Sequence, residues 1–153
     1  MSERSDDARS LSGAVPVSWA SRYVGTPYAD HGRSRAGVDC WGLACVVYAQ
    51  ELGIVLPSYA GAYASAEEID EVDALLYGAK ERQHWRQVPS ARPFDLFEFR
   101  TGGRAAHVGI ALDARRMLHV HAGGAALVEP LQPRWITRRI GIYRHINMYL
   151  RGA

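Results

Sequence analysis

The sequence predicts an α+β domain, in which helices come first and an antiparallel sheet follows. Apolar residues recur at helical spacing in the first part of the chain, and after Pro93 they alternate with polar residues as they do in strands. Glycine pairs at 102–103 and 123–124 separate expected strands, as turns do. Because short turns join antiparallel neighbours, we expect a meander packed against the preceding helices.

Length and composition indicate one globular domain. The chain has 153 residues, of which 48% are hydrophobic and 22% are charged, as is ordinary for a folded domain of this size. Residues 1–13 are polar and carry both signs of charge, so we expect a flexible leader there and a single domain over residues 14–153. The leader lacks the apolar segment of a secretory signal, so export by the general pathway is not expected.

Charge and hydropathy argue against two classes of partner. The formal net charge is +2 and the basic residues are scattered along the chain, so nucleic-acid binding has no support. No apolar run approaches the roughly 18 residues of a membrane span, so we expect no membrane partner either.

Two helices are expected in the first part of the chain. A proline opens a short helix over 16–24, and Gly25 stops it. Asp39 is a good N-cap residue before the apolar run 40–52, which has few polar interruptions and indicates a central helix buried on most sides. Gly53 suits the position after the end of that helix.

A third helix and five strands complete the predicted order. Ser65 and Glu68 form a capping box, and apolar residues at helical spacing over 69–76 predict an amphipathic surface helix. A tight turn is expected at 113–115. The strands are expected at 94–100, 107–112, 116–122, 125–129 and 139–145.

The two cysteines both lie in the predicted central helix. Cys40 and Cys45 are five residues apart, so the helical rise separates them by about 7.5 Å, beyond the reach of a disulfide. Cys45 lies among apolar residues and is expected in the core. Cys40 falls in the first helical turn, where unpaired N–H groups and the helix dipole favour a thiolate. A buried structural thiol is the alternative for Cys40.

A helix terminus alone cannot activate a thiol. Lowering a thiol pKa from about 8.5 to about 4 costs roughly 6 kcal/mol, whereas a helix N-terminus supplies at most about 2 kcal/mol. A neighbouring imidazolium must supply the remainder. A reactive Cys40 therefore requires a histidine from elsewhere in the fold.

Three histidines lie on neighbouring predicted strands. His107 begins one strand, and His119 and His121 share a face of the next. All three face the same side of the sheet if the numbers of paired residues sum to an even value. If the sum is odd, His107 faces the opposite side from the other two. A base oriented by a second polar group is what nucleophilic catalysis needs. The alternative for His107 is a structural histidine in a strand, with its hydrogen bonds satisfied. Gly109 argues against this alternative because it leaves open space on the same face of the strand.

Four motifs resemble one known family in their order and spacing. They are Gly25-Thr26-Pro27-Tyr28, Asp39-Cys40-Trp41-Gly42-Leu43, His107-Val108-Gly109-Ile110 and Met117-Leu118-His119. They resemble the NlpC-type family of papain-like cell-wall peptidases, over about residues 15 to 145 of this chain. The resemblance implies an α+β fold in which the nucleophile begins a central helix packed on an antiparallel sheet.

The resemblance also implies catalytic roles. Cys40 matches the family nucleophile, His107 the base and His119 the third polar residue that orients the base. His121 faces the same way as His119, and only the family spacing prefers His119. The implied reaction is attack of the thiol on an amide carbonyl, followed by hydrolysis of the acyl-enzyme. The family requires no metal or other cofactor.

Three further positions match the substrate side of the family site. Tyr28 matches a tyrosine that lines the site, and Asp39 matches an acidic residue implicated in recognising the peptide. The implied substrate is a peptidoglycan stem peptide, commonly cut between D-glutamate and the diamino acid that follows. Trp41 stands where many members have a serine that helps to bind the free amine of a short stem peptide, which favours intact sacculus over recycled fragments.

One branch of the family is closer than the rest. Trp41, with residues 48–54 and 56–59, resembles the branch found in phage tails and in tail-like gene transfer agents. That resemblance implies an enzyme made in the cytoplasm and carried by a virion or tail-like particle to the periplasmic cell wall. Tail or baseplate proteins are then the expected partners, and no signal peptide is needed.

Other functions are compatible with the same residues. A papain-like site can act on another amide or transfer an acyl group, because fold and dyad do not fix specificity. A structural tail or baseplate component with a decayed site is a second alternative. Zinc binding by His107, His119 and His121 is a third, although the sequence lacks the closely spaced ligand pairs of ordinary zinc sites.

Overall fold

The computed structural model describes residues 18–60, 83–101 and 104–150. Four predicted elements lie partly or wholly outside these ranges: the leader over 1–13, the start of the helix over 16–24, the capping box with its helix over 65–78, and the glycine turn at 102–103. None of the helices in the described part of the chain combines the length and the apolar character that crossing a membrane would need.

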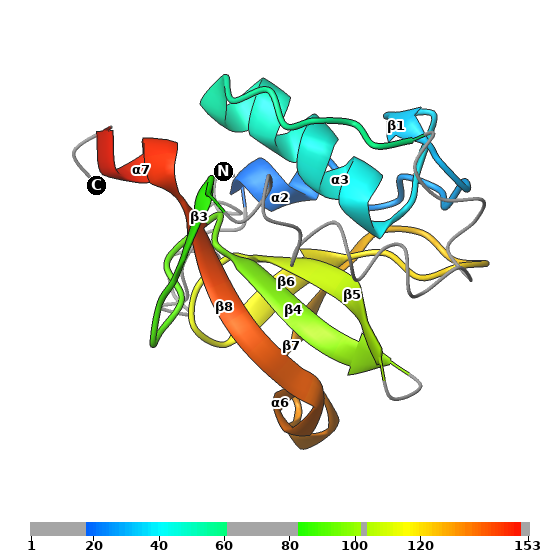
Figure 1. The fold of residues 1–153 in the computed structure, drawn as a ribbon. Helices are drawn as coiled ribbons and strands as arrows, with labels where there is room; N and C mark the ends of the chain where they lie inside the picture. The colour runs from blue at the N-terminus through cyan, green and yellow to red at the C-terminus, as the bar shows by residue number, and fades with distance from the viewer. Residues whose placement is uncertain (1–17, 61–82, 102–103, 151–153) are drawn as a thin grey trace, which may run out of the picture.

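A six-stranded antiparallel sheet forms the centre of the fold, with the order β3-β8-β4-β5-β6-β7. Figure 1 shows α3 and α2 above this sheet and α6 below it. The strands are β3 (Trp85–Gln87), β4 (Leu96–Thr101), β5 (Arg104–Ala111), β6 (Arg116–His119), β7 (Leu127–Pro130) and β8 (Arg139–His145). The predicted α+β class is confirmed.

The central helix follows the prediction. Helix α3 (Cys40–Val47) continues directly as a π-helical turn, η1 (Tyr48–Leu52). Asp39 is its N-cap, because a side-chain oxygen accepts a hydrogen bond of 2.7 Å from the backbone N–H of Gly42. Gly53 ends it in the left-handed conformation, with φ at 68°.

The first helix is shorter than predicted. Helix α2 covers Ser18–Ser21, whereas the sequence indicated continuation to residue 24. The chain turns after Ser21, since the N–H of Tyr23 reaches the carbonyl of Ala20, and Gly25 follows with φ at 94°. The start of the predicted helix lies outside the described residues.

The strand predictions differ at their ends. The last strand has the predicted bounds, while the strand predicted over 116–122 stops at His119. Beyond His119 the chain bends toward the N-terminal part of the domain, where Ala125 bridges to Pro27. Elements that were not predicted are short, so their periodicity is not visible in sequence. They are the hairpin β1 (Arg33–Ser34) and β2 (Gly37–Val38), strand β3, and helices α6 (Pro133–Arg138) and α7 (Ile146–Leu150).

The two faces of the sheet bury separate apolar clusters. On the side of α3, Ile110 and Leu118 pack in one cluster with the buried residues of that helix. On the other side, Phe99 and Met117 pack in a second cluster around Trp135 of α6. This division follows from the alternation of side chains along each strand.

The register between β5 and β6 determines where the three histidines point. Ile110 pairs with Leu118 and Ala111 pairs with Met117, so the paired numbers sum to an even value. His107 and His119 therefore face the same side of the sheet, and His121, two residues beyond the end of β6, lies there too with its ring stacked on that of His107. The rings of all three lie within 5.7 Å, centroid to centroid, of the Trp135 ring.

Candidate active site

Cys40 occupies the first position of α3, beside strand β5. Hydrogen bonds from the backbone N–H groups of Val108 and Trp41 act to lower the pKa of its thiol. Burial and the nearby Asp39 carboxylate outweigh them and raise the pKa of Cys40 to about 12. The thiolate expected from the helix terminus is therefore not the resting state. The unliganded site holds a neutral thiol.

His107 and His119 form a direct contact between imidazoles. Nε2 of His107 lies 2.9 Å from Nδ1 of His119, and the two rings stand at 77° to each other. The other nitrogen of His119, Nε2, lies 2.7 Å from Oε1 of Glu129. Both histidines are buried, with His119 fully enclosed.

Glu129 at the end of this chain of contacts is an ionised acceptor. Although burial acts to raise it, the pKa of Glu129 is lowered by hydrogen bonds from His119, Trp135 and Arg134. Its second oxygen is 2.6 Å from a guanidinium nitrogen of Arg134 and 3.1 Å from the indole nitrogen of Trp135. The carboxylate is thus fixed in place by groups on α6.

The ionised carboxylate fixes the tautomers of both histidines. Because Glu129 can only accept, Nε2 of His119 carries the proton and its Nδ1 is left as an acceptor. His107 must then donate through Nε2, which leaves a lone pair on its Nδ1. Burial, with the neighbouring His119 and His121, holds the pKa of His107 well below its usual value, so this ring is neutral at neutral pH. A neutral imidazole with an open Nδ1 is a competent base.

The Cys40 thiol, at the start of α3, contacts the part of β5 that carries His107. The N–H that reaches the Cys40 sulfur belongs to Val108, the residue next to His107. In the described part of the chain, Nε2 is the His107 nitrogen with a hydrogen-bond partner, and the ring faces α6 while α3 packs on the other side of the sheet, so the Cys40 thiol meets this strand at its backbone. The roles of Cys40 as nucleophile and His107 as base stay predictions, and the contact shown is that of the thiol with the backbone of Val108.

Glu129 was not identified from the sequence. It lies at the end of a predicted strand, as many surface glutamates do, and no motif marks it. Its pairing partner is Met117, which shares a face with His119. Only the combined register of β5, β6 and β7 brings its carboxylate to the histidines.

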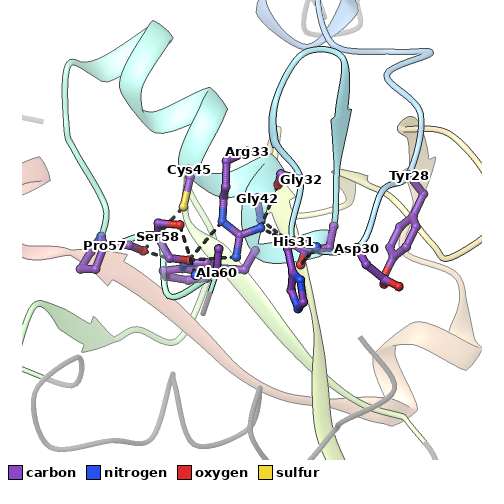
Figure 2. A network of polar contacts seen from close by, with 12 residues as sticks. Tyr28, Asp30, His31, Gly32, Arg33, Gly42, Cys45, Pro57, Ser58 and Ala60 are labelled. Carbon is purple, nitrogen blue, oxygen red and sulfur yellow. Dashed lines mark hydrogen bonds and ion pairs between the residues drawn. The ribbon is translucent and has the colours of Figure 1, made fainter. Parts of the chain in front are cut away.

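Tyr28 lies near Cys40. Burial raises the pKa of its hydroxyl most, followed by a hydrogen bond to Asp30 and by the charges of Asp39 and Cys40. The hydroxyl donates to a carboxylate oxygen of Asp30 at 2.8 Å, as Figure 2 shows. The structure therefore places the predicted site tyrosine close enough to Cys40 to sense its charge.

The two oxygens of Asp39 are engaged in holding the helix and the preceding loop. Oδ1 accepts from the N–H of Gly42 and from Arg33, both at 2.7 Å, and Oδ2 accepts from the N–H of His31 at 3.2 Å. Arg33 is fixed in turn by two hydrogen bonds to the carbonyl of Ser58, as Figure 2 shows. Asp39 is 2% exposed, so its visible role is to cap and brace the start of α3.

Trp41 packs inward, away from solvent. It is 2% exposed, and its indole N–H donates to the carbonyl of Pro57 at 2.9 Å. The thiol of Cys45 points at the same carbonyl, with a separation of 3.7 Å. Trp41 therefore fixes the segment after α3, and the structure does not bring its ring to the site surface.

His119, and not His121, makes the hydrogen bond to His107. His121 is exposed, and its ring stacks on that of His107 at a centroid distance of 4.8 Å and an interplanar angle of 6°. The structure therefore distinguishes the two residues by their contacts with His107, and the orienting role of His119 stays a prediction.

A thiol at the start of a helix, over a sheet that carries a braced imidazole pair, defines a domain of the cysteine-peptidase class. The model of the NlpC/P60 family matches residues 25–150. The chain therefore belongs to the NlpC/P60 family.

Known relatives agree with this assignment. The chain is 30% identical over 115 residues to Protein P54 of Enterococcus faecium and 30% identical over 109 residues to the probable endopeptidase p60 of Listeria seeligeri, covering 75% and 71% of this chain. It spans only 19% and 17% of the length of these two relatives. The structure of the NlpC/p60 domain of the peptidoglycan hydrolase SagA has the same fold, with a TM-score of 0.57 and 24% identity over 84% of this chain and 94% of that one.

Proposed function

We propose that this chain is a cysteine endopeptidase that hydrolyses peptide bonds in the stem peptides of bacterial peptidoglycan. The observation that carries the proposal is the hydrogen-bonded order Glu129–His119–His107, with the Cys40 thiol against the residue next to His107. Two proteins that resemble the chain bear the names probable endopeptidase p60 and peptidoglycan hydrolase SagA, which supports the substrate class.

The mechanism follows from the protonation states. Nδ1 of His107 takes the proton of the neutral Cys40 thiol as the sulfur attacks the amide carbonyl. His119 and the Glu129 carboxylate stabilise the imidazolium that forms. Backbone N–H groups at the start of α3 meet the oxyanion, the imidazolium protonates the leaving amine, and water then releases the acyl-enzyme.

The bond between D-glutamate and the diamino acid is the proposed point of cleavage, and intact sacculus is the proposed substrate. Support for sacculus comes from Trp41, which stands where many relatives have an amine-binding serine and is turned into the core. Support also comes from Asp39, whose oxygens are engaged by Gly42, Arg33 and His31. An amine of a short peptide would have to displace these contacts.

A phage tail or tail-like particle is the proposed carrier, with tail or baseplate proteins as partners. This part rests on the sequence of residues 48–54 and 56–59 together with Trp41. Immunodetection of the protein in purified particles tests it. Particles that carry Cys40→Ser and still infect or transfer at the normal rate would instead favour a structural component.

Digestion of purified sacculi tests the activity. We expect the protein to release peptides whose mass and sequence, determined by tandem mass spectrometry, show a new D-glutamyl carboxyl end. Cys40→Ala should abolish release, whereas Cys45→Ala, a matched loss of the other thiol, should retain it. Release that persists in Cys40→Ala, or none from the unaltered protein, would reject the proposed function.

A further inference from the structure

Three imidazoles gather on the sheet face that packs against α6. His119 and His121 are two residues apart, and the β5–β6 register brings His107 to the same face. One nitrogen of each residue lies within 4.8 Å of the corresponding nitrogen of the other two. His119 ends strand β6, His121 lies two residues beyond it, and His107 comes from the neighbouring strand β5, an arrangement that sequence spacing alone does not show.

The chemistry of this cluster suits a borderline divalent metal. Zinc takes imidazole nitrogens at about 2.0–2.1 Å, so tetrahedral ligands stand roughly 3.4 Å apart. The 2.9 Å between Nε2 of His107 and Nδ1 of His119 must open slightly to reach that spacing, and the separations of up to 4.8 Å within the cluster must close, which the exposed His121 ring can do by rotating.

The surroundings supply two further features of a metal site. Glu129 accepts from Nε2 of His119, which aims Nδ1 of that ring at the cluster, as carboxylates do behind ligating histidines. His121 is exposed while His107 and His119 are buried, so an ion can enter from the side of His121 and keep a water there.

We propose that His107, His119 and His121 form a three-histidine site for a zinc ion, and that occupancy of this site switches the peptidase off. The binding step stands on the geometry alone. The inhibition rests on the proposed function.

Inhibition follows from the proton on His107. A metal takes the lone pair of Nε2, and a neutral ring retains one proton, so the N–H proton moves from Nε2 to Nδ1. The base then has no lone pair for the Cys40 thiol. Its hydrogen bond to His119 is lost in the same step, because Nδ1 of His119 also faces the metal.

Binding is tested first, without an activity readout. Chelator-washed protein is titrated with Zn²⁺ by calorimetry and with Co²⁺ by visible absorption, since tetrahedral cobalt gives a strong d–d band. We expect one ion per chain for the unaltered protein, for Cys40→Ala and for His84→Asn, a matched histidine loss away from the cluster. His121→Asn, a change at an exposed ring, should weaken binding by more than tenfold.

Three binding results would overturn the site. They are no binding by the unaltered protein, equal binding by His121→Asn, and loss of binding in Cys40→Ala, which would place the ion on the thiol.

Inhibition is tested with the sacculus assay. Stoichiometric zinc should stop peptide release by the unaltered protein, and a chelator should restore it. More than tenfold higher zinc should be needed with His121→Asn. A protein that binds one zinc but never cuts sacculi leaves the site standing and rejects the proposed function, whereas one that cuts equally well with zinc bound rejects the switch.

Discussion

Nε2 of His107 and Nδ1 of His119 lie 2.9 Å apart in the interior of the domain, with the two rings in a T-shaped arrangement. The protons of this contact have defined positions because Glu129 accepts a hydrogen bond from the other ring nitrogen of His119. Neutral imidazoles have two tautomers of similar energy, and an anionic acceptor selects one of them. The carboxylate on β7 thereby determines which nitrogen of His107 on β5 carries the proton.

Replacing Glu129 tests this dependence. Glu129→Gln should lower kcat on sacculi by roughly tenfold or more, because the uncharged amide stabilises the imidazolium less well. The acidic limb of the pH–rate profile should also move to lower pH, since protonation of His107 becomes harder. Arg138→Gln, an exposed change on the same helix that contacts this carboxylate, should alter neither quantity. A profile that stays in place with Glu129→Gln would show that the carboxylate only packs.

The resting thiol makes a prediction that opposes the sequence expectation. With its pKa raised to about 12 by burial and by Asp39, Cys40 should react slowly with iodoacetamide at neutral pH, and faster only in alkali. Alkylation rates of the Cys45→Ala protein, followed by mass spectrometry between pH 6 and 10, measure this thiol alone. Fast alkylation below neutral pH would mean that the Cys40–His107 pair exists as an ion pair.

The sequence indicated the candidate site residues more readily than the contacts between them. Cys40 and His107 belong to local patterns, a capped helix and the start of a strand. Such patterns can be recognised in a sequence because they involve residues that are close together along the chain. The common face of His107 and His121 depends on a register that the turn at 113–115 sets, and both parities were compatible with the sequence. Glu129 required a second register as well. The pKa of Cys40 depends on burial, which raises it, and on the helix N-terminus, which lowers it. The extent of burial could not be predicted because it depends on segments that are distant in the sequence.

His145 should make the fold sensitive to acid. Burial, with a smaller effect of the nearby His84, lowers the pKa of His145 to about 4, while an unfolded histidine titrates near 6.5. The unfolded chain therefore binds more protons between these values, so stability is full above pH 6.5 and is lost as pH falls toward 4. The ring contributes a loss of about 2 kcal/mol between pH 7 and pH 5.

Urea unfolding at these two pH values measures the effect of His145. His145→Gln should reduce the difference between the two free energies of unfolding by that amount, while His121→Gln, at an exposed ring, should change it less. An unchanged difference in His145→Gln would mean that the ring is already protonated in the native state.

Gly42 is the position in the nucleophile helix where a side chain cannot fit. A Cβ at Gly42 would lie 1.9 Å from the carbonyl oxygen of Gly32 and 2.8 Å from a guanidinium nitrogen of Arg33. In a solvent-exposed helix, replacing glycine by alanine would stabilise the folded protein by up to about 1 kcal/mol, because alanine loses less backbone entropy on folding. Here the clash is with backbone, so the loop that carries Arg33 must move and the net effect should be destabilising by about 1–3 kcal/mol.

The loss should extend from stability to the site itself. Once Arg33 moves, its ion pair with Asp39 opens and the cap of α3 weakens, so Gly42→Ala should lower both the melting temperature and the rate of peptide release. Gly124→Ala is the matched control, because a Cβ there meets its nearest atom at 3.6 Å, an ordinary contact. A Gly42→Ala protein that melts at or above the temperature of the unaltered protein would show that the loop can move without loss of stability. The contacts of Arg33 and Asp39 would then not stabilise the start of α3.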